Sequence, residues 1–189
     1  MDRNHAFLNS FSEVSHDTFV KLQNMSSYKL LKTNTVVTKE GEIPNKIYIL
    51  LSGLMRTYFD SEAGKQHNKK IFSPTSFVGA LTAIIKKEPS KLAYETLTDC
   101  KVFEIDFDIF MKLCKTDVDI ANLYAKILER IFMQYEKRSL ELISLDATQR
   151  YIKLREQIPN IDDLIPQFQI ASYLSITPVQ LSRIRKKMN

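Results

Sequence analysis

QFQIASYLSITPVQLSRI, residues 167–184, is the most informative stretch of this sequence. Ala171 is small enough to lie where one helix crosses another, and Ser175 takes the turn position between the two helices. Thr177 followed by Pro178 is a typical helix start. Apolar residues that could face a common core recur at helical spacing: Ile170, Leu174, Ile176, Leu181 and Ile184. The stretch therefore predicts a helix-turn-helix motif.

The outward face of the second predicted helix is polar and basic. Gln180 suits adenine and Arg183 suits guanine in the major groove of DNA. Arg185 is a further outward cation, and four other residues suit phosphate oxygens: Thr177, Ser182, Lys186 and Lys187. We therefore expect this helix to contact double-stranded DNA. A helical hairpin whose basic face is merely solvated is the alternative.

The net charge of +5 supports that expectation through its distribution along the chain. Residues 147–189 contain seven Lys or Arg and three Asp or Glu. Residues 1–146 contain 20 Lys or Arg and 19 Asp or Glu, so most of the positive excess lies at the C-terminal end. A clustered positive field favours a polyanionic partner, and nucleic acid is the first candidate. A solvated, frayed basic tail is the other interpretation of the charge alone.

Residues 27–105 consist of short β-branched or alternating runs separated by Gly and Pro. The runs are NTVVTK, KIYILLSG, LMRTYFD, KKIFS, LAYETL and KVFEID. This spacing is typical of an all-β barrel or sandwich. Residues 78–87 predict a short helix inside the β domain, and residues 7–24 predict one or two short helices before it.

After residue 105 the pattern becomes helical. We expect a short helix over residues 106–114 and a long helix that is capped by Thr116 and runs to about Ser144. Its apolar stripe alternates between steps of three and four, which is a coiled-coil rhythm. We expect a homodimer through this stripe, with packing on the same chain as the alternative: Ile120, Leu123, Ile127, Ile131 and Tyr135. Another helix follows over residues 147–158, and then a connector with Asp162 and Asp163.

The order of these elements resembles the Crp/Fnr family of transcription regulators. The residues that carry the resemblance in the β domain are Gly41-Glu42, Ile47-Tyr48-Ile49, Ser52-Gly53, Phe77-Val78-Gly79 and the strand at 101–106. The resemblance implies an α+β fold in which residues 1–115 form a cyclic-nucleotide-binding-like β-roll sensor domain. Residues 116–145 would then form the dimerisation helix and residues 146–189 the DNA-binding domain, without the β wing usual in the wider family.

The resemblance also implies a function. We expect a cytoplasmic homodimer that reads a near-palindromic DNA site, with half-sites about 34 Å apart, and that contacts RNA polymerase. The runner-up is a ligand-sensing or protein-interaction module whose helix-turn-helix no longer binds DNA. Four outward cations argue against that runner-up: Arg183, Arg185, Lys186 and Lys187.

The phosphate cassette of the family departs from its usual form in this chain. Cyclic-nucleotide-binding members have Phe-x-Gly-Glu-Leu and then Arg-Ser-Ala, in which Glu holds the ribose and Arg the phosphate. Here Ala80 replaces the Glu, and Ser90-Lys91-Leu92 replaces the second motif. We therefore do not expect cAMP to bind. Two alternatives remain: the domain binds a different small effector, or it binds no effector. The candidate effector pocket is formed by Phe77, Gly79, Ala80, Leu81, Ser90 and Lys91.

The sequence contains no catalytic or cofactor motif. There is no P-loop, no Gly-x-Ser-x-Gly, no His-Glu-x-x-His and no metal-ligand spacing, so we expect neither an enzyme nor a metal protein. Cys100 and Cys114 are too few for a disulfide framework or an iron–sulfur cluster, and we expect them to be small buried residues. We expect no signal peptide and no membrane span.

Overall fold

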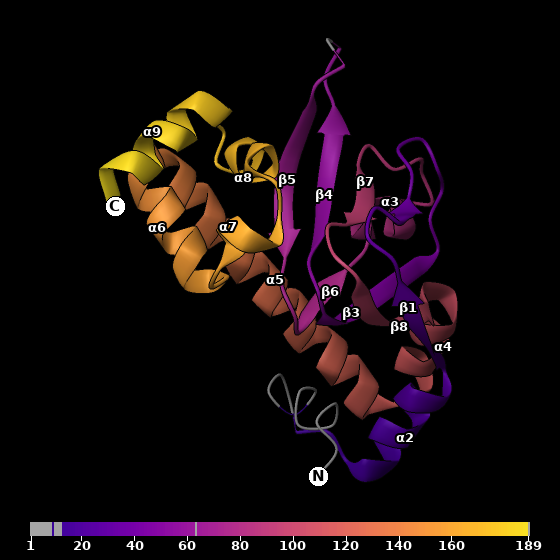
Figure 1. Cartoon of the computed structure of the whole chain (residues 1–189). Helices are drawn as coiled ribbons and strands as arrows, with labels where there is room; N and C mark the ends of the chain where they lie inside the picture. The colour runs from indigo at the N-terminus through magenta and orange to yellow at the C-terminus, as the bar shows by residue number, and fades with distance from the viewer. Residues whose placement is uncertain (1–8, 10–12, 63, 189) are drawn as a thin grey trace.

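The computed structural model describes residues 9, 13–62 and 64–188, and its N-terminal half is a roll of two four-stranded antiparallel sheets (Figure 1). One sheet has the order β1-β8-β3-β6, with β1 (Ser26–Leu31), β8 (Cys100–Asp106), β3 (Lys46–Ser52) and β6 (Ser76–Val78). The other has the order β2-β7-β4-β5, with β2 (Val36–Thr38), β7 (Ala93–Thr96), β4 (Met55–Asp60) and β5 (Gln66–Phe72). The predicted β domain is confirmed.

Apolar side chains from both sheets fill the interior of the roll. Leu50, Met55 and Val102 are fully buried there. The turn between β3 and β4 depends on Gly53, which has φ +87°. A Cβ at this position would collide with the backbone oxygen of Asp99, so no other residue fits without a backbone shift.

Three short helices flank the roll: α2 (His16–Asn24), α3 (Leu81–Lys86) and α4 (Phe107–Thr116). Ser15 caps α2 and Asp106 caps α4. The helix predicted over residues 78–87 is shorter than expected, because Val78 pairs with β3 as the end of β6. Residues 7, 8 and 10–12 of the predicted N-terminal helices lie outside the described residues.

The long helix is α5 (Val118–Ser144), and it runs diagonally from α4 toward the C-terminal helices in Figure 1. Its N-cap is Asp117, whose side chain accepts hydrogen bonds from the amides of Asp119 and Ile120 at 3.1 and 3.2 Å. The prediction of Thr116 as the cap was wrong because Thr116 is the last residue of α4. An Asp carboxylate at this end is also favoured by the helix dipole.

The predicted dimer stripe is wrong for the first half of α5. Ile120, Leu123 and Ile127 are buried in this chain's own core, in a cluster with Phe19 of α2 and Phe110 of α4. The reason is that this half of the helix lies along the outside of the first sheet and has to bury an apolar face there. These three side chains are therefore not available to a partner.

The second half of α5 carries most of the exposed apolar residues of this helix. Ile131 is partly buried against the same cluster, and the side chain of Tyr135 is 41% exposed. On the opposite side of the helix, Phe132, Leu140 and Ile143 are exposed to 68%, 60% and 85%. We call these three residues the outer stripe of α5.

The C-terminal part is a helical domain of four helices: α6 (Ala147–Gln157), α7 (Ile161–Leu164), α8 (Gln167–Tyr173) and α9 (Pro178–Met188). The short α7 lies within the predicted connector. The core of this domain also includes Leu54, Ile71 and Leu97 from the β-roll. The two domains therefore share one apolar cluster instead of being joined only by α5.

The two cysteines occupy buried or half-buried positions of the kind that small apolar residues usually take. Cys100 is buried between the sheets, and this burial raises the pKa of its thiol to about 11. Cys114 is half-buried on α4. In the part of the chain that the structure describes, no group of three or more His, Cys, Asp or Glu could hold a metal ion. None of the described helices is long and apolar enough to cross a membrane.

Candidate nucleic-acid interface and effector cavity

The turn between α8 and α9 is a Schellman motif. Ser175 has φ +58°, its N–H donates to the Ser172 carbonyl at 3.1 Å, and the Ile176 N–H donates to the Ala171 carbonyl at 3.0 Å. Ala171 is fully buried at the centre of the domain core. The predicted turn position, small residue and apolar spacing are therefore all present.

Serine is not the preferred residue at a left-handed position, because its Cβ is crowded there. We expect Ser175→Gly to raise the free energy of unfolding by about 1 kcal/mol, as glycine adopts this conformation without that cost. Equilibrium urea unfolding measures the change. Ser172→Gly is the opposite control: it places glycine inside α8, and it should destabilise the protein.

The start of α9 is fixed by a reciprocal cap. The Thr177 hydroxyl accepts from the Gln180 N–H at 3.2 Å, and the Gln180 side-chain oxygen accepts from the Thr177 N–H at 2.8 Å. Sequence reasoning assigned Gln180 to an adenine, and Thr177 to a phosphate. In this structure both side chains hold the helix end, and Gln180 also remains exposed.

Four of the predicted contact residues are exposed on α9: Ser182, Arg183, Lys186 and Lys187. Arg185 differs, because its guanidinium lies 3.6 Å from a carboxylate oxygen of Asp162. Asp162 also accepts a 2.7 Å hydrogen bond from the Tyr151 hydroxyl, which α6 positions. Arg185 thus makes an ion pair within its own domain while its side chain stays 39% exposed, and its contact with DNA stays a prediction.

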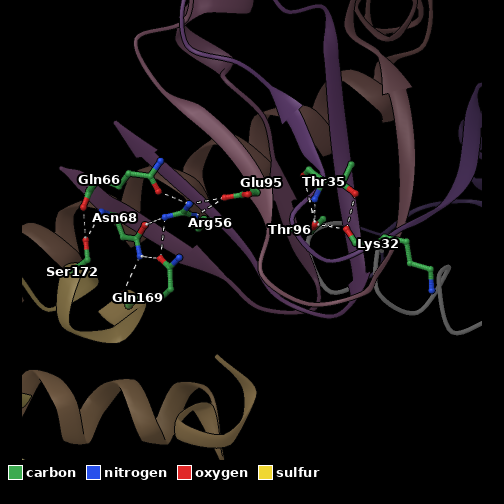
Figure 2. A network of polar contacts seen from close by, with 9 residues as sticks. All are labelled: Lys32, Thr35, Arg56, Gln66, Asn68, Glu95, Thr96, Gln169 and Ser172. Carbon is green, nitrogen blue, oxygen red and sulfur yellow. Dashed lines mark hydrogen bonds and ion pairs between the residues drawn. The ribbon is translucent and has the colours of Figure 1, made fainter. Parts of the chain in front are cut away.

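A buried arginine connects the β-roll with the first helix of the motif (Figure 2). Arg56 on β4 is only 5% exposed, and all five of its N–H groups make hydrogen bonds. Two of these bonds go to the Glu95 carboxylate on β7, at 2.6 and 2.8 Å. The others go to the side-chain oxygens of Asn68, Gln66 and Gln169.

The same network continues through Asn68 on β5. Its side-chain amide donates to the backbone and side-chain oxygens of Gln169 at 2.9 and 2.7 Å, and its backbone N–H donates to the Ser172 hydroxyl at 2.8 Å. Gln169 and Ser172 belong to α8, which lies beside β5 in Figure 1. We call Arg56, Glu95, Gln66, Asn68, Gln169 and Ser172 the β5–α8 network. Sequence reasoning did not identify it.

A cavity of about 660 Å³ opens between β5, α3 and the second half of α5. All six residues of the predicted effector pocket line it: Phe77, Gly79, Ala80, Leu81, Ser90 and Lys91. Its walls also include Phe72, Tyr94 and Tyr135. Ser90 is 3% exposed, and its hydroxyl donates to the Leu92 carbonyl at 2.6 Å, so its role in this structure is to fix the loop. Ligand binding by these residues stays a prediction.

Comparison with known proteins agrees with this architecture. Residues 28–117 match the cyclic nucleotide-binding domain family. The CRP-like protein Clp of Xanthomonas euvesicatoria is 24% identical over 158 residues, which is 80% of this chain and 65% of Clp. The matched region therefore spans less than two thirds of the length of the curated relatives.

Two solved structures have the same fold. The c-di-GMP-responsive global regulator Clp of Xanthomonas campestris superimposes with a TM-score of 0.70 at 17% identity, covering 92% of this chain and 91% of that one. A Eubacterium rectale protein described as a transcriptional regulator of the Crp/Fnr family gives a TM-score of 0.72 at 13% identity. The superposition covers 96% of this chain and 87% of that one.

The fold thus defines a class of proteins in which a cyclic-nucleotide-binding-like roll is joined by a long helix to a helix-turn-helix domain. Within that class, residues 28–117 match the cyclic nucleotide-binding domain, and the chain as a whole is similar to Crp/Fnr-type regulators.

Proposed function

We propose that this protein is a DNA-binding transcription regulator that acts as a homodimer and is not an enzyme. The observation that carries the proposal is the capped helix α9, which presents Arg183, Lys186 and Lys187 to solvent beside a rigid Schellman turn. A recognition helix that enters the major groove needs such an exposed polar face on a fixed scaffold. A cytoplasmic location and a contact with RNA polymerase belong to the same proposal.

The residue roles follow from the contacts of each side chain. Arg183 is the candidate for a bidentate contact with guanine, and Ser182, Lys186 and Lys187 are candidates for phosphate contacts. Thr177 and Gln180 orient the helix through their reciprocal cap. The Asp162 ion pair of Arg185 supports a role in holding α9 on the domain core.

The outer stripe of α5 supports the dimer. Phe132, Leu140 and Ile143 recur at steps of eight and three, and all three are exposed on one side of the helix. A two-fold axis along this side would bring the same three residues of two chains together, which is an isologous contact. The dimer would place two copies of α9 on successive major grooves, about 34 Å apart.

The test is selection of bound sequences from a random pool of DNA duplexes at one stated salt concentration. We expect the native protein to enrich a near-palindrome. Arg183→Ala should weaken binding to that site by about 1–3 kcal/mol for each half-site and relax the base preference at one position in each half-site. The affinity of each variant is measured by titration of the selected duplex.

Lys101→Ala is the matched control, because it also removes one exposed positive charge but lies on β8 in the roll. It should leave the base preference unchanged. Weak, salt-sensitive binding without enrichment in all three proteins would contradict the proposal. That result would favour a sensing or protein-interaction module whose helix-turn-helix does not read DNA.

A further inference from the structure

The cavity beside α3 is unusually basic for its size. Four lysines line it, namely Lys69, Lys70, Lys86 and Lys91, against the single carboxylate of Glu88. That carboxylate lies 4.0 Å from the Lys86 ammonium and is already part of an ion pair. Among the described residues, no carboxylate lies within ion-pair distance of Lys69 or Lys70. The cavity therefore carries more positive charge than its one carboxylate can balance.

Lys70 is the least solvated of these cations. Its ammonium donates to the Gln134 side-chain oxygen at 2.9 Å and lies 4.9 Å from the Phe72 ring centre and 5.4 Å from that of Tyr135. Lys69 lies 5.2 Å from the same Tyr135 ring. Burial, with Lys69 beside it, lowers the pKa of Lys70 to about 8. A neutral amide and two ring faces compensate a partly buried charge less well than an anion would.

Most of the remaining lining residues are apolar or aromatic. They include Phe72, Leu81, Leu92, Tyr94 and Ile131. A volume of about 660 Å³ lies within the range of small-molecule sites, which combine mostly apolar walls with a few placed polar groups. Among the described residues that line the cavity there is no arginine, so they offer no planar fork for bidentate contact with a phosphate.

We propose that this cavity binds a small organic acid, whose carboxylate or phosphate pairs with the ammonium groups of Lys69 and Lys70 and whose apolar body packs among Phe72, Tyr94 and Leu81. The proposal names the ligand class of the regulator proposed above. Binding of the acid does not depend on that proposed function, but a role of the acid as an effector does. Asn68 of the β5–α8 network directly precedes Lys69 on β5, so the anion would lie next to the contacts that hold α8.

The binding should depend on pH through Lys70. The titratable groups around it are Lys69 on β5, Tyr94 on β7, Tyr135 on α5 and, across the cavity, Lys86, Glu88 and Lys91. Burial raises the pKa of both tyrosines, to about 12 for Tyr94, so they stay neutral up to pH 9. An anion needs the charged form of Lys70, so affinity is present below pH 8 and should fall about tenfold between pH 7 and pH 9.

The test is titration calorimetry of the full chain with three anions, benzoate, hexanoate and phenyl phosphate, and with neutral benzyl alcohol. We expect at least one anion to bind and benzyl alcohol not to bind. Lys70→Met and Lys69→Met should each weaken the binding of that anion by about tenfold or more, because each loses a charge-assisted contact. Lys101→Met, an exposed lysine on β8 outside the cavity, should bind like the native protein.

Three results would overturn the proposal. They are equal binding of benzyl alcohol, unchanged anion binding in both cavity variants, and no binding of any of the three anions. The selection of DNA duplexes tests α9 independently of the cavity, so failure of this inference and failure of the proposed function give different results.

Discussion

Arg56→Met is expected to lower the free energy of unfolding by about 3–5 kcal/mol. Methionine keeps an unbranched side chain in place but removes all five hydrogen bonds of the guanidinium. The Glu95 carboxylate, with only 13% of its side chain exposed, would lose its ion-pair partner. The side-chain oxygen of Asn68 would lose its donor, and that of Gln169 would lose one of two. Urea unfolding followed by circular dichroism measures the loss.

Arg183→Met is the matched control for this prediction. It makes the same chemical change at an exposed arginine on α9, where substitutions usually alter stability by less than about 0.5 kcal/mol. Gln169→Leu removes only the α8 side of the contact and should cost an intermediate amount, about 1–3 kcal/mol. Equal losses in the Arg56 and Arg183 variants would show that the β5–α8 network does not stabilise the protein.

The helix-turn-helix could be predicted in detail because its determinants are local. Ala171, Ser175, Thr177 and Pro178 act through contacts within a few residues, so the sequence pattern is enough to position the turn and the cap. The β-roll was predictable for a related reason, since alternating apolar residues separated by turns specify short paired strands. The strands β1 and β6 were missed, and the three residues of β6 form a strand only by pairing with β3.

The features that sequence reasoning missed depend on contacts between distant parts of the chain. Arg56 lies 113 residues before Gln169, and nothing in the helix-turn-helix pattern that contains Gln169 points to a partner on β4. A signal was present, because Arg56 interrupts the apolar side of its strand and Gln169 stands beside the core residue Ile170. A polar residue in a core position must find a partner, but the sequence does not say which one.

The error in the dimer stripe has the same origin. A helix with apolar residues at alternating steps of three and four can bury them on its own chain or on a second copy, and the spacing is the same in both cases. The position of α5 along the first sheet decides between them: Ile120, Leu123 and Ile127 face the sheet. The exposed apolar residues in the second half of α5, among them Phe132, are left for a partner.

Phe132→Asp and Ile143→Asp are each expected to raise the dimer dissociation constant at least about 100-fold. A two-fold contact uses each residue twice, so one substitution places two carboxylates in the apolar interface, and each costs several kcal/mol if it stays unpaired. Sedimentation equilibrium measures the change. Binding to the selected near-palindrome should weaken with it, because a single DNA-binding domain loses the second, linked half-site.

Lys137→Asp separates this effect from a general response of α5 to charge. Lys137 is exposed on the same helix but points about 140° around the helix axis from Phe132 and about 120° from Ile143, the two substituted positions. It changes the net charge more than either apolar substitution, so dissociation driven by charge alone would be largest in this variant. If the two apolar substitutions act by disrupting the interface, the Lys137 variant should stay dimeric. If both apolar variants remain dimeric as well, the chain associates through another surface, and the spacing of the two copies of α9 must be set by that surface instead.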